Sequence, residues 1–197
     1  MDYPLMETPF VLVPFEEMNK KQVEQYYQWF MTEKDKRIHQ LEEYINKNNT
    51  EKVVLDKSPE SLIPLWEWFE HQIEWEERSQ KEIDDEVKGK PEWMREIIQQ
   101  STKKMTILTM ALTTDIATYF GETLIYNNPS IRWGYLLKPL KLDGVKEPIL
   151  LGFKKNISMN PRGIVHVCVL KSSRQKNKMK LFESYTNWLD MVKGIGS

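Results

Sequence analysis

The hydrophobic pattern of this chain changes its period after about two thirds of its length. From Met18 to Ile125, most apolar side chains recur three or four residues apart, as on one face of an α-helix. After the helix-stopping residues 127–129 (NNP), apolar residues fall into short runs rich in β-branched and aromatic side chains. Helices followed by strands predict an α+β fold rather than an alternating α/β fold.

We predict a single α+β domain over residues 1–197, because 40% hydrophobic residues can supply one substantial core. Its helical half covers about 15–126. A strand-rich half, about 130–170, forms a short antiparallel sheet of about three strands. A C-terminal amphipathic helix covers about 178–192.

Within the helical half, the pattern predicts one long helix from Met18 to the Asn-rich residues 46–50. Ser58 and Pro59 predict the start of a second helix, as N-cap and first helical residue. The charged segment 74–90 reads as a solvated helix or a mobile loop. A third, strongly apolar helix is expected from about Thr102 to Ile125.

Charge and cysteine content indicate a cytoplasmic protein. Acidic and basic residues nearly cancel, to a net charge of −1, so no overall field favours nucleic acid. The basic run 171–180 lacks interleaved aromatic residues and reads as a solvated loop. The single cysteine, Cys168, lies in an apolar run, and the N-terminus lacks the pattern of a signal peptide. We expect no membrane span and no nucleic-acid partner.

Two carboxylates occupy one face of the third helix. Asp115 and Glu122 are seven residues apart, which places them roughly 10 Å apart along the axis with Tyr119 between them. One hypothesis is that these three residues form the site of a hydrolase or a metal-dependent enzyme. The favoured hypothesis is structural.

In the structural hypothesis, Asp115 or Glu122 pairs with Arg132 or a backbone donor and fixes the helix against the strand that carries Trp133. Gly121 supports this reading, because a glycine within a helix lets another element approach closely.

Other residues offer little recognisable chemistry. The three histidines, at positions 39, 71 and 166, lack the spacing of a zinc site. His166 and Cys168 would share one face of the predicted strand 164–170, which suggests a nucleophile and its base, but a packed cysteine is favoured. No nucleotide-binding or hydrolase motif occurs. We predict no metal and no cofactor.

Several motifs together suggest a family. The stretch 26–41 (YYQWFMTEKDKRIHQL), the stretch 58–68 (SPESLIPLWEW), the helix with 115–122 (DIATYFGE) and the strand of Trp133 resemble a widespread family of uncharacterised bacterial proteins of about this size. The resemblance implies a recurring fold and a bacterial cytosol. It implies no catalytic residue.

The leading functional hypothesis is a non-enzymatic protein that binds another protein. It rests on the absence of a strong catalytic signature beside a charged segment bordered by aromatic residues. The predicted binding residues are Trp75, Glu76, Glu77, Asp84 and Asp85. A toxin is one expected class of partner, by analogy with small α+β immunity proteins.

Overall fold

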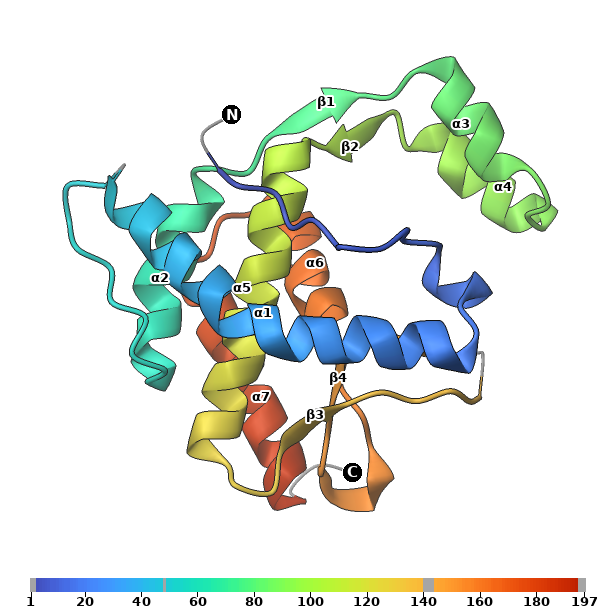
Figure 1. Ribbon diagram of the computed structural model, residues 1–197. Coiled ribbons are helices and arrows are strands. Elements are labelled where there is room, and N and C mark those ends of the chain that lie inside the picture. The colour runs from blue at the N-terminus through green and yellow to red at the C-terminus, as the bar shows by residue number, and fades with distance from the viewer. Residues whose placement is uncertain (1–2, 48, 140–143, 195–197) are drawn as a thin grey trace.

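A central helix, α5 (Ile107–Asn127), organises the computed structural model, which describes residues 3–47, 49–139 and 144–194. Four helices surround it: α1 (Lys20–Lys47), α2 (Leu62–Glu70), α6 (Pro161–Ser172) and α7 (Lys180–Lys193). Figure 1 shows α1 running across α5, with α6 and α7 beside it. This assembly is called the body below.

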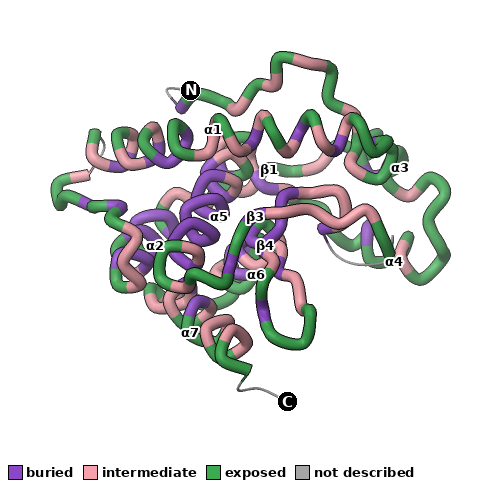
Figure 2. Tube along the Cα trace, turned by 60° about the horizontal axis from the view of Figure 1, so that its bottom comes forward, coloured by how far each residue is buried: buried purple, intermediate pink, exposed green. Residues whose placement is uncertain are grey.

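The sequence of α5 explains its central place. Thr106 caps the helix by accepting a hydrogen bond from the Thr109 N–H, and Asn128 follows its last turn. Between these ends almost every side chain from Leu112 to Leu124 is buried. The tube in Figure 2 shows this burial concentrated along α5. A helix that is apolar on most sides is stable only when other elements cover it.

The long first helix, the start of the second and the C-terminal helix are confirmed. Ser58 accepts a hydrogen bond from the Ser61 N–H and opens the short 3-10 helix η2 (Pro59–Ser61), which leads into α2. Two further 3-10 helices occur, η1 (Phe15–Glu17) and η3 (Lys154–Asn156).

The mixed α and β content is confirmed, but the single sheet of about three strands is wrong. In the described residues, β3 (Arg132–Gly134) pairs antiparallel with β4 (Ile149–Leu151), and Trp133 lies opposite Leu150. A separate pair joins β1 (Trp75–Glu77) to β2 (Lys103–Met105).

The run 164–170, predicted as a strand, belongs to helix α6 instead. Asn160 accepts a hydrogen bond from the Arg162 N–H, and Pro161 occupies the first turn, so a helix begins just before the run. Val165, Cys168 and Val169 are buried, whereas Val167 is exposed. This is the i, i+3, i+4 pattern of a helix, and it outweighs the preference of valine for strands.

The charged segment 74–90 contains a solvated helix, one of the two predicted alternatives, but it also contains a strand, and the start of the third helix differs from the prediction. Residues 75–105 form strand β1, helix α3 (Gln80–Val87), helix α4 (Glu92–Gln100) and strand β2. The apolar helix therefore begins at Ile107 and not near Thr102. Figure 1 shows α3 and α4 at the end of the β1–β2 ribbon, away from the body. Residues 75–105 are called the arm below.

The arm has a small apolar centre of its own. Ile83 of α3 and Ile98 of α4 are buried, yet neither belongs to the main hydrophobic cluster, which runs from Tyr3 to Tyr185. The ribbon joins that cluster through Met105 and the half-buried Trp75. The arm is thus anchored at its base and self-packed at its tip.

Candidate functional site

The first candidate is the pair of acids on α5, and the structure encloses Asp115 in donors. The Asp115 carboxylate accepts hydrogen bonds from the Arg37 guanidinium, one of them 3.0 Å from Nε to Oδ1, and from the Tyr3 hydroxyl. The Asp115 side chain is 1% exposed. The remaining Arg37 nitrogen, Nη1, donates to the Pro4 carbonyl at 2.8 Å and to Gln40 at 3.0 Å.

The electrostatics of this cluster reflect its burial. Burial raises the pKa of Asp115, while Arg37 and Tyr3 oppose that rise by donating to its carboxylate. Burial lowers the pKa of Arg37, but its hydrogen bonds and charge contact with Asp115 outweigh burial and raise it. The pKa of Tyr3 is raised by burial and by the neighbouring carboxylate. We infer an ion pair, because an arginine stays protonated in proteins and the donors of Arg37 and Tyr3 favour the ionised form of Asp115.

Glu122 lies in a second cluster on the same face of α5. Its Oε1 accepts from Trp133 Nε1 at 2.7 Å and pairs with Lys34 Nζ at 3.0 Å. Its Oε2 pairs with Lys57 Nζ at 3.3 Å. Between the two acids, the Tyr119 hydroxyl contacts Ser61 Oγ at 2.5 Å and accepts from the Lys57 N–H at 2.9 Å.

The predicted partner of the two acids was wrong. Arg132 is exposed, and the cations that meet Asp115 and Glu122 are Arg37, Lys34 and Lys57. Trp133 does contact the helix, as expected for the strand that follows. A Cβ added to Gly121 would lie 2.5 Å from Cζ2 of the Trp133 indole, which explains the glycine.

This geometry does not assemble Asp115, Tyr119 and Glu122 as a catalytic group. A hollow of about 250 Å³ touches Asp115 and is lined mainly by Leu5, Met6, Ile107 and Met110, without Glu122 or Tyr119. Each carboxylate is instead occupied by cations or other donors of the body. The arrangement cross-links the N-terminal segment, α1, α5 and β3.

The arm is the second candidate. In its ribbon, lysines of β2 pair with two of the acids predicted to bind a partner. Glu76 pairs with Lys104 at 3.3 Å and Glu77 with Lys103 at 3.7 Å. Trp75 is half-buried against the core. Three of the five predicted binding residues therefore face cations or apolar neighbours of the same chain.

Helix α3 keeps more of its negative charge at the surface. Ser79 and Glu82 form a capping box at its start, and the Glu82 carboxylate also contacts Lys104. Asp84 accepts from the Gln80 amide at 2.8 Å, and the exposed Asp85 pairs with Lys88 at 2.6 Å. Asp84 and Asp85 thus remain on the outer surface of the arm.

Helix α4 adds an apolar surface that sequence reasoning missed. Trp93 is 63% exposed and Ile97 is 61% exposed. They are four residues apart on one helix, so they share a face. All seven tryptophans lie in the described residues, and Trp93 alone is exposed. The sequence pattern shows apolar residues at helical spacing here but not which of them the fold leaves uncovered.

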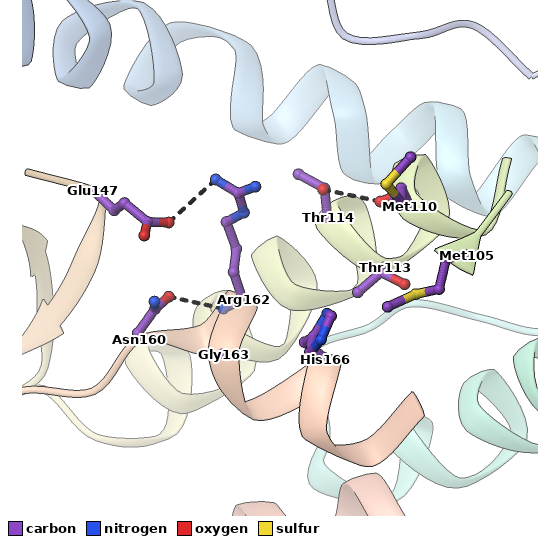
Figure 3. A pocket seen from close by; sticks show the side chains of 9 residues that line it. All are labelled: Met105, Met110, Thr113, Thr114, Glu147, Asn160, Arg162, Gly163 and His166. Carbon is purple, nitrogen blue, oxygen red and sulfur yellow. Dashed lines mark hydrogen bonds and ion pairs between the residues drawn. The ribbon is translucent and has the colours of Figure 1, made fainter. Parts of the chain in front are cut away.

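The third candidate is a cleft of about 290 Å³ between the first halves of α5 and α6, at the base of the arm. Figure 3 shows Arg162 along one side, Met105 and Met110 along the opposite side, and His166 below. Thr113, Thr114, Glu147, Asn160 and Gly163 complete the lining. Residues 164–170 were predicted as a strand, so this cleft was missed; the Asn160–Pro161 helix start is the signal that could have revealed it.

His166 and Cys168 point to different parts of the structure. In a helix, residues two apart point in different directions, so the shared face predicted for them is wrong. His166 lines the cleft, and burial lowers its pKa, with Arg162 adding to the effect. Cys168 faces α7, where its Sγ lies 3.4 Å from Ser184 Oγ, and burial raises the pKa of its thiol.

The structure offers no arrangement for a metal ion within the part of the chain it describes: no three His, Cys, Asp or Glu residues converge there. None of the helices in that part has the length and apolar content needed to cross a bilayer. The arm and the cleft both present groups to a ligand at the surface.

Comparison with known proteins gives no relative: no family model, no curated protein and no solved structure matches this chain. The resemblance to uncharacterised bacterial proteins stays a prediction. Function must therefore be argued from the surfaces themselves.

Proposed function

We propose that this protein binds another protein through its arm. The observation that carries the proposal is the exposed pair Trp93 and Ile97 on α4. Tryptophan is enriched at the centres of protein interfaces, where its large area becomes buried. A helix of a freestanding protein normally turns such side chains inward.

The position of the pair supports a docking role. The arm is held away from the body by the β1–β2 ribbon (Figure 1), and its own apolar centre, Ile83 and Ile98, is already filled. Trp93 and Ile97 are consequently not needed to close either core. A partner would bury them without disturbing the fold of the body.

The charge of helix α3 indicates the kind of partner. Helix α3 (QKEIDDEV) has four acidic side chains and one basic side chain, and Asp84 and Asp85 lie at its surface. A complementary partner has an apolar pocket for Trp93 with basic residues at its rim. The predicted binding set is thereby modified: Asp84 and Asp85 stay in it, and Trp93 and Ile97 take the place of Trp75, Glu76 and Glu77.

Site-specific crosslinking tests this proposal. A photo-crosslinking amino acid is placed at position 93 and, as a matched control, at position 126, because Tyr126 is 69% exposed at the other end of α5. We expect one cellular protein to crosslink at 93 only. No such protein above the control level would contradict the proposal.

Affinity with the purified partner gives the quantitative test. Replacing Trp93 and Ile97 with serine is expected to weaken binding about 100-fold or more, the effect of removing two hot-spot residues. Tyr126→Ser is the control and should bind as the parent does. If the variant with both Trp93 and Ile97 replaced by serine, called the double arm variant, binds as tightly as the parent, the arm is not the binding surface.

The partner is proposed, more narrowly, to be a toxin. Only a class-level analogy supports this part of the proposal. The measurement is the toxic activity of the purified partner, which the parent protein should block at equimolar concentration and the double arm variant should not. A partner without toxic activity contradicts the narrower proposal and leaves protein binding intact.

A further inference from the structure

The cleft between α5 and α6 combines an apolar wall with polar groups that have unused bonding capacity. Met105 and Met110 form the wall, and methionine adapts its shape to a variety of apolar groups. The volume, about 290 Å³, is just below the roughly 300–1,000 Å³ of sites for drug-sized molecules. It fits one or two amino-acid residues.

Two threonines supply hydrogen-bond acceptors. Thr113 Oγ1 donates its proton to the Thr109 carbonyl at 2.7 Å, and Thr114 Oγ1 donates to the Met110 carbonyl at 3.0 Å. A hydroxyl has one proton, so each oxygen offers only its lone pairs to a ligand. The α5 side of the cleft therefore favours a ligand that carries N–H groups.

Arg162 supplies donors on the opposite side. Its Nη1 lies 3.2 Å from Glu147 Oε2, and Figure 3 shows Glu147 on the side of Arg162 that is away from the methionines. A guanidinium has five N–H donors, and the Arg162 side chain is 44% exposed. It can hold Glu147 and a second carboxylate together. His166 stands between the two sides, and no hydrogen bond to its ring occurs among the described residues.

We infer that this cleft binds the C-terminal residue of a peptide chain. The terminal carboxylate accepts from Arg162, the last backbone N–H donates to a threonine hydroxyl oxygen, and an apolar last side chain lies against Met105 and Met110. Capture of a chain terminus is an established mode of peptide recognition. The inference rests on the proposed function in one respect, because it makes the protein partner the source of the peptide end.

The order of groups across the cleft favours a peptide end over an internal segment. Donors of Arg162 stand opposite the apolar wall, with acceptors of Thr113 and Thr114 between them (Figure 3). A C-terminal residue presents a carboxylate, an N–H and one side chain within the same short span. An internal residue lacks the carboxylate that Arg162 would hold.

Fluorescence anisotropy with a defined probe tests the inference. The probe is a dye-labelled hexapeptide, Ser-Gly-Ser-Gly-Ser-Leu, with either a free carboxylate or a C-terminal amide. We expect amidation to weaken binding about tenfold or more, because a charge-assisted hydrogen bond is lost. Arg162→Ala should weaken the free acid to a similar degree. Arg132→Ala, at an exposed arginine of β3, is the matched control and should leave binding unchanged.

A second variant tests the apolar wall without touching the ion pair. Met110 is 47% exposed, so Met110→Ser should preserve the fold. The parent should bind the hexapeptide that ends in leucine more tightly than one that ends in serine, and this difference in affinity is expected to disappear in the variant. The free acid should still bind more tightly than the amide. Retention of the full leucine preference would overturn the placement of the side chain.

Three results would overturn the inference as a whole. The first is equal binding of the acid and the amide, and the second is no binding of the acid at about 1 mM. The third is competition by 4-methylpentanoic acid, which keeps the carboxylate and the leucine side chain but lacks the N–H, as strong as by the hexapeptide; that result would assign the cleft to small carboxylic acids. The double arm variant separates this inference from the proposed function: it should bind the hexapeptide normally even where it no longer binds the protein partner.

Discussion

The body and the arm both contain acid–base pairs, but they place them in opposite surroundings. Asp115 and Arg37 are enclosed between α1 and α5, with side chains 1% and 4% exposed. Glu76, Glu82 and Lys104 meet on the outside of the arm, in contact with water. The residue types are the same, so the difference comes from burial.

Burial determines what each kind of pair does. A buried charge that loses its partner keeps its full desolvation penalty, so the body depends on Asp115 and Arg37 staying together. Exposed ion pairs contribute little to the free energy of unfolding, because water and salt screen them. The arm therefore holds its shape mainly through Ile83 and Ile98, while most of its acids pair with cations at its surface. Four predictions, in order of decreasing effect, test this contrast.

The largest effect is expected from Asp115→Asn. The substitution leaves the Arg37 guanidinium buried without a counter-charge, which commonly costs about 3–5 kcal/mol of unfolding free energy. Urea denaturation followed by circular dichroism measures it. The exposed acid of the arm provides the matched control, and Asp84→Asn should unfold at the parent's urea concentration. Similar stabilities of both variants would refute the contrast between body and arm.

Ile98→Ala is expected to affect the arm alone. It removes a buried side chain from the small centre between α3 and α4, at a cost of about 2–3 kcal/mol, the lower part of the range for such truncations. Because this centre lies outside the main cluster, amide hydrogen exchange should accelerate in 80–100 and stay unchanged in α5. Faster exchange at Leu112 and Ile116 as well would show that the arm and the body unfold together.

Gly121→Ala tests the close contact of α5 with β3. The added methyl group would overlap the Trp133 indole, which must move away from Glu122, at an expected cost of about 1–3 kcal/mol. Thermal or urea unfolding measures the change. In a Trp133→Ala background the same substitution should become neutral or stabilising, since alanine favours a helix more than glycine does. An unchanged cost in that background would locate the clash elsewhere.

The smallest effect concerns Glu82 in the first turn of α3. Its hydrogen bond with Lys104, together with those from Ser79, lowers its pKa to about 2 from the ordinary 4.5. A lowered pKa in the folded state contributes stability that is present above the unfolded pKa and is lost as the pH falls from about 4.5 to about 2. Lys104→Met should raise the pKa of Glu82, as measured by an NMR titration of its side-chain carbon. An unchanged pKa would mean that Ser79 alone lowers it.

Much of the body could be predicted from the sequence because its signals are local. The spacing of Val23, Phe30, Ile38 and Leu41 marks α1, and Ser58 with Pro59 marks the turn into α2. Gly121 predicted a close approach, which Trp133 makes. Each of these signals acts over a few residues along the chain, where capping and side-chain period are decided.

The arm and the cleft were missed because their signals are weak or compete with stronger ones. Each strand of the ribbon is three residues long, too short to show an alternating pattern, and charged residues dominate both. In α6, four valines and isoleucines within 164–169 favour a strand, while the Asn160–Pro161 start favours a helix. Packing of Val165, Cys168 and Val169 against the body resolves that competition.

By itself, the sequence determined α1, the start of α2, the C-terminal helix α7 and the need of Asp115 for a donor, because a carboxylate in an apolar helix must be compensated wherever that helix packs. Only the tertiary structure decided which donor it meets. Arg132 is near in the sequence, yet Arg37, 78 residues away, takes the place, because α1 crosses α5 and turns its cations toward the two acids. The exposure of Trp93 was decided in the same way, by where the ribbon directs the arm. A side chain's neighbours across space depend on how whole elements pack, and no local pattern carries that information.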